Sequence, residues 1–149
     1  MTDTELMLIA LNEAKKASDQ GEVPVGAVVA KEGQIIAVGR NRREKNKNAL
    51  CHAEIEAIDL ACKTLHGWRL SGCDIYVTLE PCPMCAGAII NARFNRVIFG
   101  CYDDKAGCFG SVANFAEMNF NHKPEIIGGV MEMECSALLQ TFFEKLRNP

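Results

Sequence analysis

Hydrophobic and polar residues follow two periods along the chain, and these periods predict helices and strands. Apolar residues at helical spacing follow a capping box made by Thr2 and Glu5, and this pattern ends at Gly21. Two short β-rich runs come next, at residues 24–31 and 34–40, with a Glu-Gly turn between them. The first part of the chain therefore predicts a helix followed by a β-hairpin.

The rest of the chain predicts helices that alternate with strands. We expect a helix over about 52–66, a strand at 74–79, a helix at 83–91, a strand at 96–100, a short helical piece around 112–118, a strand at 125–130 and a helix at 132–147. Such alternation indicates a sheet covered on both faces. The predicted fold is α/β, a three-layer α-β-α arrangement around a mixed, mostly parallel five-stranded sheet in which the first hairpin makes one antiparallel pair. Because no repeat or shift in composition divides the chain, we expect residues 1–149 to form a single domain.

Eight cysteines are the unusual part of an otherwise globular composition, with 48% hydrophobic and 23% charged residues. An even count could indicate a disulfide scaffold, but a chain of 149 residues with this apolar content can bury a core without disulfides. The N-terminus carries acids where a secretory signal needs Lys or Arg, and no apolar run approaches the roughly 18 residues of a spanning helix. We therefore expect a cytoplasmic protein without a membrane partner, whose reduced thiols serve packing or metal binding.

The net charge of −3 excludes a strongly basic protein that binds nucleic acids regardless of their sequence. The positive charges are clustered, however, because five of the sixteen Lys and Arg residues lie between positions 40 and 47. A run of this kind usually forms a solvated loop. Contact with RNA is the other interpretation, and the choice depends on what adjoins the run.

Two segments carry the candidate chemistry, Cys51-His-Ala-Glu54 and Glu80-Pro-Cys-Pro-Met-Cys85, and each lies at a predicted helix start. Cys82 and Cys85 are three residues apart, so both thiols face the same side of one helical turn. Pro83 suits the first helical position, because its missing N–H would be unpaired there anyway, and this places Cys82 at the cap. The positive end of the helix favours the thiolate, which is the form that binds metals.

His52 and Glu54 are two residues apart and cannot both line one helical face. We therefore expect His52 to bind a metal that lies off the helix end, and Glu54 to stand beside this metal as a catalytic carboxylate. His52, Cys82 and Cys85 form a ligand set that suits zinc, and three protein ligands leave the fourth tetrahedral position for water. A water in that position ionises near pH ~7, and a neighbouring carboxylate can take its proton.

A structural zinc site and a redox dithiol are the alternatives. A structural site needs a fourth ligand, for which the sequence offers Cys51, His66, Cys73, Cys101, Cys108 and His122. A redox pair would use Cys82 and Cys85 but would leave the His-x-Glu segment without a purpose. The combined pattern of His-x-Glu and, about 28 residues later, Pro-Cys-x-x-Cys favours a catalytic zinc.

This combined pattern is the signature of the zinc nucleobase deaminases. The chain resembles in particular the bacterial tRNA-specific adenosine deaminases, from about Glu5 to Arg147. The segments that carry the resemblance are residues 23–27, 39–42, 52–55, 68–70, 76–88 and 99–111. The resemblance implies a cytidine deaminase-like fold and a hydrolytic reaction that converts adenosine to inosine and ammonia at the wobble position of a tRNA anticodon.

The resemblance also implies roles for individual residues. One Zn²⁺ per subunit would be held by His52, Cys82 and Cys85, while Glu54 would protonate the ring and then the departing amine. The pocket that receives the base would include Asn41, whose amide hydrogen-bonds the base, and its walls would include the backbone around Ala53 and the Leu79-Glu80 turn. The loop that contacts the RNA backbone would include Asp103 and Lys105.

The implied partners are a tRNA anticodon stem-loop and a second copy of the chain in a homodimer. Because the basic run flanks Asn41, RNA contact becomes the favoured interpretation of that loop. The last helix offers a second candidate RNA contact, which comprises Phe142, Phe143, Lys145 and Arg147. The small residues at 86–88 would permit close helix packing in a dimer. Cys51 departs from the family pattern and places a spare thiol, and a conceivable fourth ligand, near the metal.

Two other functions fit parts of the pattern. A deaminase of a free base or nucleoside, of the guanine or cytosine type, shares the metal motif but has no use for the basic loop. A non-catalytic RNA-binding zinc module would keep the metal with a filled fourth coordination position and would be indifferent to Glu54.

Overall fold

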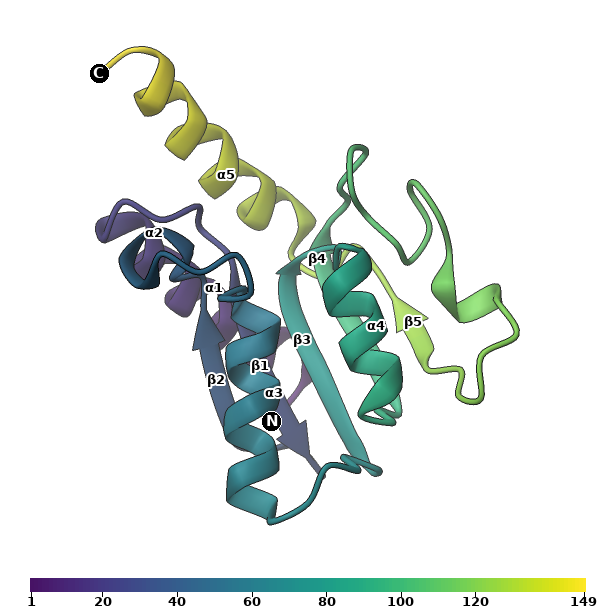
Figure 1. Cartoon of the computed structure of the whole chain (residues 1–149). Coiled ribbons are helices and arrows are strands. Elements are labelled where there is room, and N and C mark those ends of the chain that lie inside the picture. The colour runs from purple at the N-terminus through teal and green to yellow at the C-terminus, as the bar shows by residue number, and fades with distance from the viewer.

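A five-stranded sheet in the order β2-β1-β3-β4-β5 forms the centre of the computed structural model, which describes residues 1–149 (Figure 1). The strands are β1 (Gly26–Lys31), β2 (Gln34–Arg40), β3 (Cys73–Leu79), β4 (Arg96–Cys101) and β5 (Glu125–Ile127). The helices are α1 (Asp3–Asp19), α2 (Arg43–Asn46), α3 (Ala53–Leu65), α4 (Pro83–Asn91) and α5 (Glu132–Arg147), with a 3₁₀ turn η1 (Phe115–Glu117). The predicted α/β class and the five strands are confirmed.

Strand directions confirm a mixed, mostly parallel sheet. Strands β3, β4 and β5 are parallel, and β1 is antiparallel to both of its neighbours, β2 and β3, so four of the five strands run the same way. The sequence predicted one antiparallel pair, and the β1–β3 pair is a second. The reason is burial: five of the six residues of β1 are buried, whereas β2 starts with two exposed residues. The more buried strand of the hairpin therefore lies inside the sheet and the other forms the edge.

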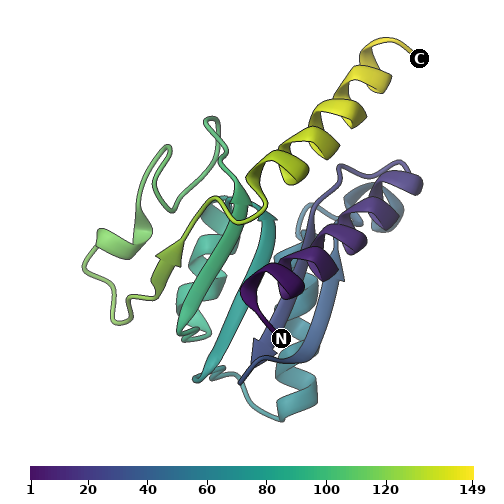
Figure 2. The same cartoon turned by 180° about the vertical axis from the view of Figure 1, so that it is seen from behind.

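Helices cover both faces of the sheet, which gives the predicted three layers (Figures 1 and 2). On β3, Ile75 and Val77 belong to a core shared with α3 and α4, while Tyr76 belongs to a core shared with α1 and Cys135 of α5. This alternation follows from the two-residue period of a strand. No helix of the structure has the length and apolar character needed to cross a membrane.

Three elements differ from the sequence prediction. The basic run contains a single helical turn, α2, where a loop was expected, and η1 is shorter than the predicted piece at 112–118. Strand β5 ends at Ile127, before Val130, because a glycine pair follows it and Gly129 has a φ of 88°. Helix α5 leaves the sheet after its first turns and extends outward (Figure 2), and Cys135 is its only fully buried residue.

The starts of α3 and α4 lie at the same edge of the sheet, which is the edge where the parallel strands β3 and β4 end (Figure 1). Helix α3 reaches this place because it packs directly on β2. At Gly39 a Cβ would lie 2.4 Å from the carbonyl oxygen of Ala53, so only glycine admits the first turn of α3 there. Ligands of α/β proteins bind beyond the carboxyl ends of parallel strands, and the candidate site lies at this edge.

Candidate active site

A pocket of about 660 Å³ opens at this edge of the sheet. It is lined by most of the residues that the sequence singled out, which are Asn41, His52, Ala53, Glu54, Cys82, Asp103 and Lys105. Leu139 and Phe143 of α5 also line it, so the projecting helix forms part of its mouth. The structure thus brings the predicted residues of four separate segments together around one cavity.

Two helix N-termini place the predicted metal ligands. His52 is the N-cap of α3 and Cys82 is the N-cap of α4, with Pro83 at the first helical position as predicted. Cys85 lies in the first turn of α4 and is buried. Both caps have extended backbone, which turns their side chains away from the helix and toward the space that they share.

The ligand atoms stand at distances that suit a tetrahedral zinc ion. The Nδ1 atom of His52 is 3.7 Å from the Sγ of Cys82 and 3.5 Å from the Sγ of Cys85. Zinc bonds of about 2.0 Å to nitrogen and about 2.3 Å to sulfur, at a tetrahedral angle, separate these atoms by about 3.5 Å. The donor set and its spacing therefore fit Zn²⁺.

No other residue joins this cluster. His52, Cys82 and Cys85 are the one group of potential metal ligands whose donor atoms lie within 4.8 Å of one another, so none of the six alternative ligands completes a structural site. Cys51 does not join despite its position next to His52, and its sulfur lies 3.5 Å from Nδ2 of Asn46. The three-ligand arrangement leaves the fourth position open, which is typical of catalytic zinc.

The two thiols of the cluster differ in acidity. The imidazole of His52 contacts both sulfurs, and interaction with the neighbouring thiol of Cys85 contributes most to lowering the pKa of Cys82 to about 4. The same contact, together with burial, raises the pKa of Cys85 above its ordinary value. One thiolate is therefore present at neutral pH, ready to bind a cation.

Glu54 is buried and lines the pocket from the first turn of α3. It takes part in none of the ion pairs of the molecule. Burial raises the pKa of its carboxyl to about 7. A carboxyl with such a pKa exchanges protons readily near neutral pH.

Asn41 is 4% exposed and its amide is held at both ends. Its Nδ2 donates to the carbonyl oxygen of Val23 at 3.2 Å, and its Oδ1 accepts from the N–H of Arg43 at 3.2 Å. An amide has a second N–H and a second lone pair, so Asn41 keeps one donor and one acceptor for a ligand. The contacts fix the direction in which these groups point.

Asp103 and Lys105 line the pocket from the loop that follows β4, a segment separate from the one that carries Asn41. The Oδ1 atom of Asp103 accepts from the backbone N–H groups of Lys105 at 3.0 Å and Ala106 at 3.2 Å, so its first role in the structure is to shape a turn. Lys105 is exposed and makes no ion pair. Its charge is available at the rim of the pocket.

The basic run divides into paired and free charges. Arg40 binds Glu13 at 3.3 Å, and Arg42 binds Glu56 at 2.9 Å, so these two cations belong to the protein framework. The remaining three, Arg43, Lys45 and Lys47, are exposed and unpaired, and Arg43 also lines the pocket. Within the basic run, only these three have a charge that no carboxylate of the protein neutralises.

The hydrogen bonds of two buried carboxylates that support the pocket were not predicted, although the turn at Leu79 and Glu80 was expected to form part of its wall and does line it. Glu22 accepts from the backbone N–H groups of Glu44 at 3.0 Å and Lys45 at 2.8 Å, which caps α2 and explains the unexpected helical turn. Glu80 accepts four hydrogen bonds from residues 103, 109 and 111. Their partners are 22 to 31 residues away in sequence, so no local pattern could have revealed these contacts.

Comparison with protein families gives a match over residues 1–147 to the family described as MafB19-like deaminase. The chain is 51% identical to the tRNA-specific adenosine deaminase of Bacillus subtilis, over 99% of this chain and 92% of that protein. It is 47% identical to the tRNA-specific adenosine deaminase of Aquifex aeolicus, over 94% of this chain and 93% of that protein.

Comparison with solved structures also finds deaminases. A structure from a study of A-to-I editing by tRNA:A34 deaminases at the wobble position of transfer RNA superposes with a TM-score of 0.89 and 42% identity, over 91% of this chain and 99% of that one. The guanine deaminase of Bacillus subtilis superposes with a TM-score of 0.66 and 29% identity, over 81% of this chain and 88% of that one.

Proposed function

This chain belongs to the MafB19-like deaminases and, within them, to the tRNA-specific adenosine deaminases, and on that premise we propose that it deaminates adenosine to inosine at the wobble position of a tRNA anticodon. The reaction adds water at C6 of adenine and releases ammonia. The observation that carries the proposal is the meeting, in one pocket, of a three-ligand zinc set and a buried carboxylate that no cation neutralises.

His52, Cys82 and Cys85 are the residues that would hold one zinc ion per subunit, because their donor atoms have tetrahedral spacing. When bound, zinc supplies Lewis-acid chemistry that makes water nucleophilic near neutral pH. The two helix N-termini hold the ligands at the pocket floor, so the attacking water is delivered to a base that enters from the mouth.

Glu54 performs the proton transfers. It accepts a proton from the attacking water, delivers it to the ring as C6 is attacked, and then supplies a proton to the amino group that leaves as ammonia. The second proton comes from the hydroxyl group at C6 as it becomes the carbonyl of inosine. The steps therefore balance: water provides the oxygen of inosine, the proton that stays on the ring and the third proton of ammonia, whose other two hydrogens belong to the original amino group. Glu54 lines the same pocket as His52 and Cys82, and its burial shields the carboxyl from bulk water.

The walls of the pocket would hold the RNA. Asn41 reads the base with the donor and the acceptor that its backbone contacts leave free, and the backbone at Ala53 closes that side of the pocket. Asp103 and Lys105, from the loop after β4, contact the RNA backbone at the rim. The free cations Arg43, Lys45 and Lys47 extend the positive surface beside it, which makes the overall net charge of −3 no obstacle.

The alternatives fit less well. The guanine deaminase of Bacillus subtilis shares the fold at 29% identity, against 42% for the structure from the tRNA:A34 deaminase study and 47–51% for the two tRNA-specific adenosine deaminases. A structural zinc module needs a fourth ligand, and the three-residue cluster offers none.

The test is an assay of two substrate types on one preparation whose zinc content is measured. We expect an anticodon stem-loop with adenosine at the wobble position to yield inosine, while free guanine, cytosine and adenosine remain unchanged. Glu54→Ala should keep its zinc and its fold and lose deamination by about 10³-fold or more. Asp59→Ala, which removes an exposed carboxylate from the same helix, is the matched control and should stay active.

Turnover of a free base without inosine in the RNA would overturn the proposed substrate, and full activity in Glu54→Ala would overturn the proposed proton transfer.

We extend the proposal to a cytoplasmic homodimer. A tRNA substrate places the enzyme in the cytoplasm. A dimer is supported by the small residues at 86–88 of α4, where Gly87 is exposed and the space around a Cβ would be empty. Sedimentation equilibrium of the purified chain should give twice the mass of 16.3 kDa, and a single-chain mass would exclude the dimer.

A further inference from the structure

Glu80 lines the pocket and is almost completely buried, yet the reaction described above gives it no task. It lies between β3 and the Pro81-Cys82 segment that begins α4. Its carboxylate meets the loop after β4, which contains Asp103 and Lys105. A buried negative charge therefore stands two residues before Cys82, one of the proposed zinc ligands.

Four donors from the loop surround this carboxylate. Its Oε1 accepts from the backbone N–H of Asp103 at 3.0 Å and from the hydroxyl of Ser111 at 2.5 Å. Its Oε2 accepts from the backbone N–H groups of Phe109 and Ser111, both at 3.1 Å. No Lys or Arg pairs with Glu80, so hydrogen bonds from the loop alone compensate the buried charge.

The loop also fits closely around this carboxylate, because residue 107 has no side chain. A Cβ at Gly107 would lie 2.3 to 2.6 Å from the carboxyl carbon and both oxygens of Glu80. The backbone of Gly107 does not have the positive φ that favours glycine, so the carboxylate itself excludes a side chain there. A further hydrogen bond from the N–H of Cys108 to the carbonyl oxygen of Pro81, at 2.9 Å, fastens the same loop to the start of α4.

Both oxygens of Glu80 are occupied by two donors each, which separates this residue from Glu54 although both line the pocket. An oxygen that already accepts two hydrogen bonds has little capacity left for a proton or a ligand. The charge of Glu80 is therefore directed into the protein, while that of Glu54 is free to act on a substrate.

We propose that Glu80 is a positioning residue for the reaction: its carboxylate holds the loop of residues 103–111 at a fixed position relative to the metal ligands. Asp103 and Lys105 can then contact the RNA backbone while the adenine base lies beside the metal ligands. This inference rests on the proposed function. It predicts that changes at Glu80 raise the KM for RNA much more than they lower kcat, since a loosened loop must be ordered each time that RNA binds.

The test measures kcat, KM and zinc content for a graded series of variants on the anticodon stem-loop. Glu80→Gln puts an amide N–H group against the N–H donors of the loop, and we expect KM to rise about tenfold while kcat stays within about threefold. Glu80→Asp keeps the charge and should recover part of the loss. Ser111→Ala removes one of four hydrogen bonds and should raise KM about two- to threefold. Asp59→Asn, on the exposed face of α3, is the control and should change neither constant.

A double-mutant cycle tests the Glu80–Gly107 approach itself. Gly107→Ala should raise KM in the wild-type background, because its new Cβ meets the carboxylate, and should add little in a Glu80→Ala background, where the obstruction is gone. Additive effects would overturn the proposed contact. A fall in kcat with unchanged KM, or no effect of Glu80→Gln on either constant, would overturn the positioning role.

Hydrogen exchange separates this proposal from the proposed function. The amides of Asp103, Phe109 and Ser111 should exchange slowly in the wild type and at least about tenfold faster in Glu80→Gln, with no change in α1. This result does not depend on any activity. Unchanged exchange would overturn the role of Glu80 even in an active enzyme, whereas an inactive wild type with the expected exchange would overturn only the proposed substrate.

Discussion

The floor and the walls of the pocket are built in different ways. The floor is the cluster of His52, Glu54 and Cys82, which line the pocket, together with the buried Cys85. Each of these residues is a helix cap or lies in a first helical turn. The walls are the segments 40–50 and 102–114, which have little regular structure of their own. Buried carboxylates hold these walls through backbone N–H groups, Glu22 for the first and Glu80 for the second.

This difference suits the floor to the chemical step and the walls to the binding of RNA. Helix starts packed on a sheet are rigid, so they suit ligands that must stay within tenths of an ångström of one geometry. A wall held by one carboxylate can change its sequence and its exposed charges while its backbone stays attached. We therefore expect substitutions in the floor to abolish the reaction and substitutions in the walls to change the binding of RNA.

The largest effect is expected at the floor. Cys82→Ser replaces a thiolate by a hydroxyl that is a poor zinc ligand, so zinc content should fall and deamination should drop on the order of a thousandfold or more. Zinc stoichiometry and stem-loop deamination measured on the same sample check this. Cys62→Ser, a half-buried thiol of α3 outside the cluster, should keep both zinc and activity. A fully loaded, active Cys82→Ser would show that the floor does not depend on this ligand.

A smaller effect is expected at the first wall. Replacing Lys45 and Lys47 by Gln removes two exposed, unpaired charges and should weaken RNA binding without changing kcat. The slope of log Kd against log salt should fall by about 0.7 for each phosphate of a single strand that the protein no longer neutralises. Lys63→Gln, whose charge is paired with Asp59 on α3, is the matched control. An unchanged slope would show that Lys45 and Lys47 do not contact RNA phosphates and belong to a solvated loop.

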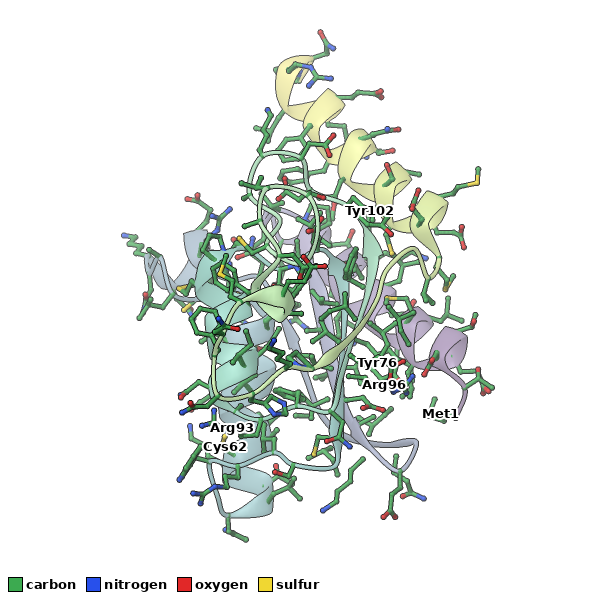
Figure 3. All side chains as sticks on the ribbon, turned by 90° about the vertical axis from the view of Figure 1, so that its right-hand side faces the viewer. Met1, Cys62, Tyr76, Arg93, Arg96 and Tyr102 are labelled. Atoms are coloured by element: carbon green, nitrogen blue, oxygen red, sulfur yellow. The ribbon has the colours of Figure 1, made fainter.

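The smallest effect on activity is expected far from both regions. Figure 3 shows Tyr76 and Arg96 together near the N-terminal end of the chain, away from Tyr102 of the pocket. There Arg96 binds Asp3 at 3.0 Å and Asp74 at 2.7 Å, and Tyr76 donates to Asp3. The hydrogen bond from Arg96 is the largest cause of a lowered pKa for Asp3. The free energy of unfolding should therefore depend on pH in the acid range where Asp3 takes up a proton.

Because the pKa of Asp3 is lower in the folded state, its stabilisation is complete above its unfolded pKa of about 4 and is lost as the pH falls through the folded value. The side chain is 37% exposed, so solvent screening limits the stabilisation to about 1 kcal/mol or less. Asp3→Asn should lower Tm by about 2–4 °C at pH 7, and this difference should shrink as the pH drops below 4. KM and kcat should not change. A constant Tm difference at all pH values would contradict the ion-pair explanation.

Most of the floor was predictable because its causes are local. The Cys-x-x-Cys spacing, Pro83 after the cap and the two-residue offset between His52 and Glu54 act within one helical turn. They placed Cys82 at a cap and His52 at a helix start, as the structure confirms. Helical and strand periods likewise predicted the elements and the layers, since burial on one face imposes them.

The rest depended on contacts between residues that are distant in sequence. Three features could not be predicted: the place of β1 between β2 and β3, the helical turn α2, and the hydrogen bonds by which Glu22 and Glu80 hold the walls. Each requires knowing which segments meet in space. The sequence by itself predicted the α/β class, the three candidate ligands and the carboxylate proposed to carry protons, through short-range geometry. The tertiary structure decided which cations and which pocket carboxylate stay without partners in the protein, because hydrogen bonds and ion pairs made across the fold use up the others.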